Sequence, residues 1–398
     1  MGEIMKKVIG WIIIIILSVC SFMIVKEKTE IYNIGNENDN AEFKIKYKGL
    51  KGAVDFTSIN DKIYIAFPHM IKCIENGKEP YTVLNDENLN IECAEPVGES
   101  LYFISNSKLM SYDINNKNVK EHIANLPNTG DYKNILLKSY DDKLFITIGA
   151  MTNSGVVGDD NTWISENKDN HDLTPETIKV NENSKGAFVK KGEANTSNQT
   201  IKASEIGNSS VVIFNTSTGD FETYAWGIRN INGIDITDDG KIYATVGGYE
   251  PRGDRPVYND SDYIYEIKKD HWYGFPDYSG GDSLESPRFN LEGKDKVKMI
   301  LSEIPMNPPA PYYQYTNVNS LGWIAIDETG KIAKNNKGSI FFYNKENNSI
   351  YYSLIGGVFE KFIGLNSDCV ATSMKIINNE LYILDSGNGF LFTIEGKQ

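Results

Sequence analysis

The sequence predicts an all-β protein, a six-bladed β-propeller with two long loop insertions, and a repeated hairpin pattern supports this fold. The pattern is a turn of Asp, Asn or Gly, then a polar residue and a strand that alternates β-branched and aromatic residues. Its six copies occupy residues 60–65, 98–103, 141–146, 239–244, 337–342 and 378–383. The first three copies and the last two are spaced by about 40 residues, the period of a four-stranded blade. No segment after the leader has a sustained 3.6-residue apolar period, so little helix is expected.

Two gaps in the repeat predict the insertions. Each gap of roughly 100 residues exceeds one blade, which indicates long loops at about residues 152–204 and 250–319. The first loop is polar and the second is rich in Pro and aromatic residues. We expect both loops on one face, near the central channel, because long loops on a rigid β scaffold often carry function. An open all-β sandwich is the alternative fold, but the repeat period favours the propeller.

Residues 1–28 have the features of a membrane anchor or a signal. Lys6 and Lys7 precede an apolar run over residues 8–25. A run of about 18 residues is near the minimum that spans a bilayer as a helix, and the lysines favour an orientation with the rest of the chain outside. We expect one uncleaved transmembrane helix that holds the protein in the cell membrane. A lipoprotein signal ending at Cys20 and a cleaved secretory signal are the alternatives.

All three alternatives place the rest of the chain on the extracytoplasmic side. Residues 29–43 are expected to form a polar stalk and residues 44–398 the propeller. The formal net charge of −14 argues against a nucleic-acid partner, which usually requires a basic patch. The chain contains no Cys-x-x-Cys and no Cys-x-x-Cys-His, so neither a zinc ribbon nor a covalently attached haem is expected.

Three ordered segments carry a more specific signal. Residues 227–233 read Gly-Ile-Arg-Asn-Ile-Asn-Gly and precede a predicted hairpin. Residues 130–134 read Gly-Asp-Tyr-Lys-Asn, and residues 272–276 read Trp-Tyr-Gly-Phe-Pro. In their order along the chain and in their spacing, the segments resemble the glucose/sorbosone dehydrogenase family, whose signature is Gly-x-Arg-Asn-x-x-Gly followed by a hairpin. The likeness is specific over about residues 130–289.

The resemblance implies an enzyme that oxidises the C1 hydroxyl of a sugar by hydride transfer to pyrroloquinoline quinone (PQQ), with calcium beside the cofactor. Carried over to this chain, it implies that Arg229 and Asn230 contact the quinone. The backbone carbonyls of Gly248 and Tyr249 match the positions that hold calcium. A guanidinium suits quinone and carboxylate oxygens because it can donate two parallel hydrogen bonds. The alternative for Arg229 is a structural ion pair with a nearby carboxylate such as Asp262.

Several features of the family's site are missing, which indicates a degenerate active site. The family has its general base, a His, in the segment equivalent to residues 130–134, and this chain has no His there. Asp131 is the remaining candidate, although an ordinary pKa of about 4 makes Asp a weak base. Ala150 stands where the family has an acidic residue, and no Arg follows Arg288 to clamp a cofactor.

Other candidate site residues lie in the predicted loops: Asp262 in an acidic segment, Trp272 and Tyr273 in an aromatic one, and His171 in the first insertion. Two functions therefore stay open. The signature segments favour a membrane-anchored, PQQ-dependent sugar dehydrogenase with an altered base. The missing His and arginines favour a non-catalytic surface propeller that binds a carbohydrate, a peptide or an envelope polymer. The expected partner is a sugar or another small polar ligand.

Overall fold

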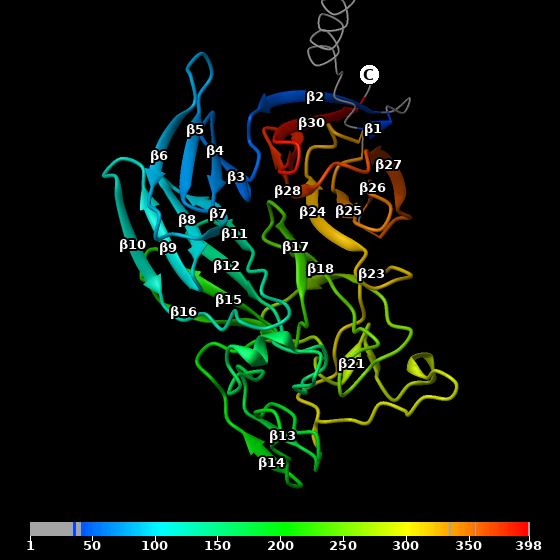
Figure 1. Ribbon diagram of the computed structural model, residues 1–398. Coiled ribbons are helices and arrows are strands. Elements are labelled where there is room, and N and C mark those ends of the chain that lie inside the picture. The colour runs from blue at the N-terminus through cyan, green and yellow to red at the C-terminus, as the bar shows by residue number, and fades with distance from the viewer. Residues whose placement is uncertain (1–34, 37–40, 334–335, 355, 397–398) are drawn as a thin grey trace, which may run out of the picture.

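The computed structural model describes residues 35–36, 41–333, 336–354 and 356–396. These residues form antiparallel sheets that stand around a central axis (Figure 1). Counted over the described residues there are six such blades, which confirms the predicted propeller. The only helices in this part of the chain are two 3-10 turns, η1 (Thr162–Ser165) and η2 (Pro287–Phe289).

The first three blades follow the chain, and each begins with its innermost strand. Blade 1 contains β3 (Asp55–Ile59), β4 (Lys62–Phe67), β5 (Met70–Ile74) and β6 (Tyr81–Asn85). Blade 2 contains β7 (Ile91–Val97), β8 (Ser100–Ser105), β9 (Lys108–Asp113) and β10 (Asn118–Ile123). Blade 3 contains β11 (Leu137–Tyr140), β12 (Lys143–Ile148), β15 (Ser210–Asn215) and β16 (Phe221–Trp226), with the short β20 (His271–Trp272) added in parallel at its edge.

The last three blades complete the circle. Blade 4 contains β17 (Ile231–Ile236), β18 (Ile242–Val246), β19 (Tyr263–Ile267) and β23 (Tyr313–Gln314). Blade 5 contains β24 (Leu321–Asp327), β25 (Ser339–Asn344), β26 (Ser349–Leu354) and β27 (Glu360–Leu365), with β1 (Gly35–Asn36) at its edge. Blade 6 contains β28 (Ala371–Ile377), β29 (Glu380–Asp385) and β30 (Phe390–Gly396), and its outermost strand is β2 (Ala41–Lys48).

The ring is closed in two ways. The innermost strands contact one another around the axis in the order β3, β7, β11, β17, β24 and β28, and β28 returns to β3. In blade 6, β2 from the beginning of the described chain pairs with β30 from its end, with Ala41 opposite Gly396. Closure leaves few open sheet edges, which would otherwise invite pairing with other chains. β1 and the first residues of β2 lie within the segment expected to form a stalk.

Each copy of the repeated pattern lies at the turn between the innermost and second strands of one blade. Tight hairpin turns of this kind require positive φ, which Asn, Asp and Gly adopt at least cost. The φ angle is 54° at Asp141, 81° at Gly240 and 51° at Asn378. The local turn chemistry therefore explains why the sequence repeat counts the blades.

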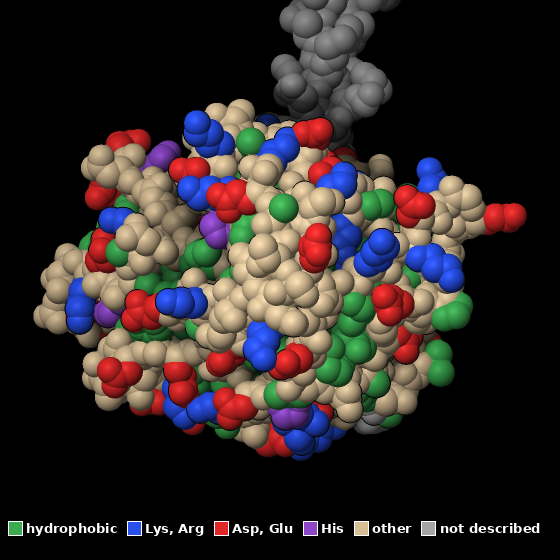
Figure 2. All heavy atoms as spheres, turned by 90° about the horizontal axis from the view of Figure 1, so that it is seen from below, with side chains coloured by type: hydrophobic (Ala, Val, Ile, Leu, Met, Phe, Trp, Pro, Cys, Tyr) green, Lys and Arg blue, Asp and Glu red, His purple; other side chains and the backbone are tan. Residues whose placement is uncertain are grey.

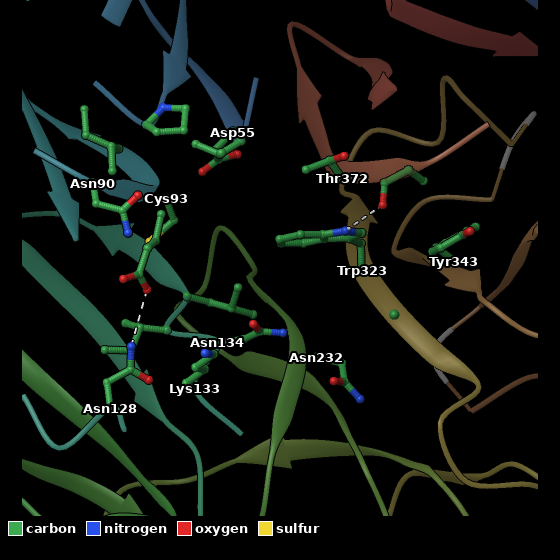
Figure 3. Close-up of a pocket in the computed structure, with 18 of the residues that line it drawn as sticks. Asp55, Asn90, Cys93, Asn128, Lys133, Asn134, Asn232, Trp323, Tyr343 and Thr372 are labelled. Carbon is green, nitrogen blue, oxygen red and sulfur yellow. Dashed lines mark hydrogen bonds between the residues drawn. The ribbon is translucent and has the colours of Figure 1, made fainter. Parts of the chain in front are cut away.

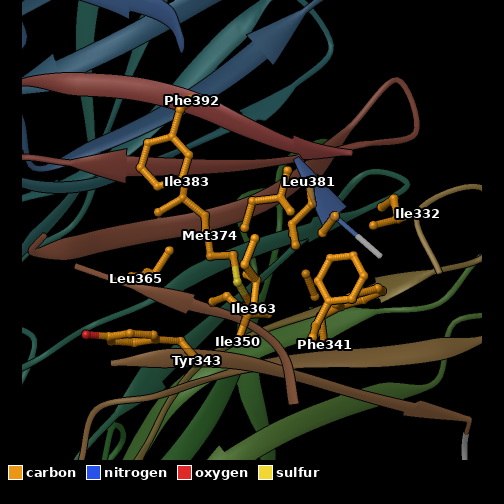
Figure 4. Close-up of a cluster of buried hydrophobic side chains, with 14 of the residues drawn as sticks. Ile332, Phe341, Tyr343, Ile350, Ile363, Leu365, Met374, Leu381, Ile383 and Phe392 are labelled. Atoms are coloured by element: carbon orange, nitrogen blue, oxygen red, sulfur yellow. The ribbon is translucent and has the colours of Figure 1, made fainter. Parts of the chain in front are cut away.

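The hydrophobic core lies between neighbouring blades. Figure 4 shows the cluster between blades 5 and 6, where Phe341 and Ile350 face Met374, Ile383 and Phe392. The other five interfaces between neighbouring blades have clusters of the same kind. Since both faces of a blade are buried in this way, β-branched and aromatic residues suit its strands. The axis is left to polar side chains.

The insertions are divided differently from the prediction. The first runs between β12 and β15 and contains η1 with the hairpin of β13 (Ile178–Val180) and β14 (Gln199–Ile201). The second is interrupted by the blade strand β19, so its loops are residues 247–262 and 268–312, the latter with η2, β21 (Tyr278–Ser279) and β22 (Asp282–Ser283). The period alone could not reveal a blade strand placed between two long loops.

The two insertions pack on each other beside blades 3 and 4 (Figure 1). Val180 of the first forms an isolated bridge with Leu301 of the second, and a separate hydrophobic cluster joins them. Figure 2, which views this side of the protein, shows acidic and basic side chains intermixed, with a group of hydrophobic side chains to the right. The inserted segments thus form one compact lateral unit.

The expected transmembrane helix falls on residues that lie outside the described ones. Within the described part of the chain, no helix has the length and apolar character needed to cross a membrane.

Candidate functional site

A cavity of about 710 Å³ lies where the innermost strands begin, at one end of the central channel (Figure 3). All six blades contribute to its lining because their innermost strands converge on the axis. The lining mixes polar and apolar side chains and includes two large aromatic ones. Its principal side chains are Asp55, Asn90, Glu92, Asn128, Lys133, Asn134, Asn232, Trp323, Tyr343, Lys345 and Thr372.

Trp323, on β24, is the central aromatic side chain of this cavity. It is half-buried, and its Nε1 donates a hydrogen bond to the carbonyl of Ala371 at 3.3 Å. Figure 3 shows its ring extending from β24 toward the middle of the cavity. The hydrogen bond links blades 5 and 6 and holds the ring at the cavity wall.

A buried ionic network lies further along the innermost strands. Lys375 Nζ lies 3.2 Å from Asp55 and 3.1 Å from Glu95, and Lys138 Nζ lies 2.7 Å from Asp235. Burial acts to lower the pKa of Lys375, but the two carboxylates outweigh it and raise that pKa. The space beside these groups is only about 30 Å³. The paired charges therefore fill the channel and close the cavity on this side.

Arg229, the expected quinone contact, does not line the cavity. Its side chain is 4% exposed and donates to several protein acceptors. Nε donates to the carbonyl of Asn153 at 2.9 Å, and Nη1 donates to the carbonyl of Gly247 at 3.3 Å. Nη2 donates to Glu250 at 3.2 Å, and the guanidinium lies 4.1 Å from the ring centre of Tyr132. The partner carboxylate is thus Glu250 and not Asp262.

This contact is part of a larger network, which we name the arginine clasp. Its members are Asp131, Tyr132, Arg229, Glu250 and Arg252. Tyr132 donates its hydroxyl to Glu250 at 2.6 Å and accepts hydrogen bonds from both arginines. Burial acts to raise the pKa of Glu250. Hydrogen bonds from Tyr132 and Asn319 and the charge of Arg229 outweigh burial and lower the pKa to about 2. The clasp joins the loop before β11 to the second insertion.

Asp131, the candidate base, belongs to the same clasp. Its Oδ2 lies 2.8 Å from Arg252 Nη1 and accepts a hydrogen bond from Asn161 at 2.8 Å. Its Oδ1 accepts a hydrogen bond from Trp163 Nε1, also at 2.8 Å. Both oxygens are therefore engaged, and Asp131 is absent from the residues that line the cavity.

The carboxylates of the acidic loop near Gly248 and Tyr249 are engaged within the protein. Asp262 is fully buried, and its carboxylate accepts backbone hydrogen bonds from Gly248 at 3.0 Å and from residues 319–321 at 2.7–3.1 Å. Asp260 accepts from Tyr249 N at 2.7 Å. Calcium requires several free oxygen ligands, whereas these carboxylates are used to hold the loop. Among the described residues, no group of three or more His, Cys, Asp or Glu side chains could hold a metal ion.

The remaining candidates do not converge on the cavity. Trp272 and Tyr273 are buried core residues within the second insertion. His171 lies in the first insertion, and its Nδ1 contacts a backbone carbonyl of its own loop at 3.0 Å. Asn230 is linked indirectly, because its Nδ2 donates at 3.0 Å to Asn232, which lines the cavity. The structure therefore brings Arg229, Gly248, Tyr249, Asp262 and Trp272 to the insertions rather than to the channel.

Sequence reasoning missed Glu92, Asn128 and Trp323. The signature segments 130–134 and 227–233 do contribute to the lining, through Lys133, Asn134 and Asn232. Within the described lining of this cavity there is no residue of the inserted segments. A usable signal existed. In most blades the lining residues stand one strand length before the repeated turn, as Glu92 does before Gly98 and Thr372 before Asn378. The innermost strand of a propeller blade starts at the channel mouth.

Comparison with known proteins gives a consistent picture of the fold. No family model and no curated protein matches the sequence. A crystal structure of a glucose dehydrogenase matches with a TM-score of 0.59 at 12% identity, over 90% of this chain and 100% of that one. The PQQ domain of pyranose dehydrogenase from Coprinopsis cinerea matches with a TM-score of 0.58 at 11% identity, over 92% and 97% of the two chains.

The PQQ-bound aldose sugar dehydrogenase from Streptomyces coelicolor has a TM-score of 0.54 at 10% identity, over 91% of this chain and 100% of that one. These matches extend over nearly the whole length of both partners, so they describe the complete ring of blades. The resemblance inferred from the signature segments is thereby confirmed for the fold: this chain is a six-bladed propeller of the same architecture as the PQQ-dependent glucose and aldose sugar dehydrogenases.

Proposed function

We propose that the protein is a carbohydrate-binding propeller that holds a sugar in the central cavity without oxidising it. The observation that carries this proposal is a separation of two groups of residues. Trp323 and a set of amide side chains line the cavity, whereas Arg229 lies outside it and is paired with Glu250. The residues available to a ligand are therefore those of a binding site.

The cavity chemistry suits a polyhydroxylated ligand. Asn90, Asn134 and Asn232 each carry both a donor and an acceptor, which matches the dual character of sugar hydroxyls. The ring of Trp323 supplies an apolar face against which the C–H side of a pyranose packs. A concave site with an aromatic side chain and a few polar groups is typical of small-molecule recognition.

The PQQ-dependent sugar dehydrogenase is the second candidate, and two lysines favour it. Lys133 and Lys345 line the cavity and would pair there with the carboxylates of PQQ. The cofactor would supply the hydride acceptor when bound. No His lies among the described lining residues, and Asp131 is held in the arginine clasp. The residues present therefore support binding better than catalysis.

The experiment is a calorimetric titration of the purified protein with glucose and related pyranoses, without added cofactor. We expect saturable binding that is lost in Trp323→Ala and retained in Tyr81→Ala, a control that removes an exposed ring from an outer strand. A parallel reconstitution with PQQ and calcium should give no aldose-dependent reduction of a redox dye. Dye reduction that requires PQQ would contradict the proposal and establish the dehydrogenase.

The proposal includes a location. The apolar run at residues 8–25 and the two lysines before it support a single-pass anchor in the cell membrane with the propeller outside. Protease added to intact cells should then release the propeller. Protection of the propeller from protease would contradict this topology.

A further inference from the structure

We propose that Glu92 forms a subsite for a primary ammonium group, so that the preferred ligand of the cavity is an amino sugar with a free amine. This inference rests on the proposed carbohydrate-binding function and specifies its ligand. It follows from the hydrogen bonds and burial of two residues: Glu92 at the beginning of blade 2 and Asn128 in the loop between blades 2 and 3.

Glu92 lies on the innermost strand β7, lines the cavity and is half-buried. Its Oε2 accepts a hydrogen bond from Asn128 Nδ2 at 3.3 Å, which is long for an N–H···O bond. In the described part of the chain it forms no ion pair with a Lys, Arg or His. A half-buried carboxylate with one long hydrogen bond has lost hydration without full compensation.

Asn128 makes the same corner rich in acceptors. The residue is 8% exposed, and its Oδ1 is enclosed with no donor among the described residues. Its Nδ2 donates to Glu92, and Oδ1 belongs to the same amide group. An unsatisfied enclosed acceptor costs about 1–3 kcal/mol. A hydroxyl supplies a single donor, whereas an ammonium supplies three N–H groups. It also supplies a positive charge to pair with Glu92, which forms no ion pair among the described residues.

The other buried carboxylates of the channel are satisfied. Asp55, which also lines the cavity, accepts hydrogen bonds from Ala94 N at 3.0 Å and Ser373 Oγ at 2.6 Å, and pairs with Lys375. Glu95 pairs with the same lysine. Both of these channel carboxylates therefore have a cation, whereas Glu92, at the wall of the cavity, forms no ion pair among the described residues.

Lys133 is the side chain of the cavity that could supply a cation to Glu92. It lines the same cavity, but its side chain is exposed and it does not form an ion pair with Glu92. Burial raises the pKa of Glu92, and the charge of Lys133 acts in the opposite direction at longer range. An ammonium bound at Glu92 would therefore compete with Lys133 for the carboxylate, which gives a second variant for the test.

The test compares glucosamine, glucose and N-acetylglucosamine by calorimetry near neutral pH. These sugars differ only at the second carbon, where glucosamine alone carries a cation. We expect glucosamine to bind at least about 10-fold more tightly, as one charge-assisted hydrogen bond permits. Glu92→Gln should remove this preference with little change in Tm. The control Glu87→Gln, an exposed carboxylate on the neighbouring loop, should retain the preference, and Lys133→Met should increase glucosamine affinity several-fold.

The outcomes separate this inference from the proposed function. Equal affinity for the three sugars, or a preference for glucuronate governed by Lys133 and Lys345, would overturn the ammonium subsite and leave carbohydrate binding intact. Binding of ethanolamine that depends on Glu92, with no binding of any sugar, would support the subsite and refute the carbohydrate proposal. Absence of binding by all of these probes would overturn both.

Discussion

Arg229 Nη2 lies 3.2 Å from Glu250 Oε2, and this ion pair ties the start of blade 4 to the second insertion. The guanidinium is covered by Tyr132 and also bonded to two backbone carbonyls. Arg229, the central residue of the family signature in the sequence, therefore uses its hydrogen-bond donors within the protein. Removing it should change stability more than ligand binding.

Arg229→Met should lower the free energy of unfolding by about 1–3 kcal/mol. It leaves the buried carbonyl of Asn153 without this donor, while Glu250 loses one cation and keeps its ion pair with Arg252 at 2.9 Å. Urea unfolding monitored by tryptophan fluorescence measures the loss. Arg288→Met is the control, since that arginine is more exposed and lies at the rim of the second insertion. A variant of unchanged stability that no longer binds sugar would show that Arg229 contacts the ligand.

Glu250 should make the stability depend on pH in the acid range. Its folded-state pKa of about 2 is below the ordinary value of 4.5, so ionised Glu250 stabilises the folded protein. That contribution is fully present above about pH 4.5 and is lost as the pH falls toward 2. Glu250→Gln should therefore cost about 1–3 kcal/mol at neutral pH and progressively less below pH 4.5. Urea unfolding of both proteins across this range tests the prediction, and a difference independent of pH would refute it.

Lys375→Met should destabilise the ring by about 3–5 kcal/mol, because Asp55 and Glu95 then lose their shared buried cation. The added variant Lys375→Met with Asp55→Asn and Glu95→Gln removes all three charges and should recover much of this loss. Thermal and urea unfolding provide the measurement. Additive losses in the triple variant would argue that the hydrogen bonds of the carboxylates, and not their charges, hold the blades together.

Gly233→Ala should separate blades 4 and 5. A Cβ at this position would lie 2.7 Å from the carbonyl oxygen of Gly322 and 2.7 Å from Ile324 N, both on the neighbouring innermost strand. Such overpacking costs about 1–3 kcal/mol and should displace Trp323, which follows Gly322. We expect lower stability together with weaker sugar binding. Gly219→Ala, where the space is open but φ is 84°, is the control and should leave binding unchanged.

The blade count and the hairpins were predictable because their causes are local. A turn at Asp141 or Gly240 needs positive φ whatever surrounds it, and a strand between two packed blades needs β-branched and aromatic residues along its length. Six such turns therefore predicted six blades. The strand β19 was missed because it stands between two long loops without the pattern that marks the other blades.

The site was decided by tertiary structure. Whether Arg229 faces a ligand or a carboxylate depends on where Glu250 and Tyr132 arrive, and neither position follows from local conformation. The cavity is assembled from short segments of six blades, which contain residues such as Glu92 and Trp323 that are distant in the chain and share no motif. Turn geometry and strand periodicity depend on interactions between residues that are neighbours in the chain, so they can be predicted from the sequence. The pairing of buried charges and the packing of the two insertions depend on residues that are distant in the chain. Only the closed ring brings these residues together.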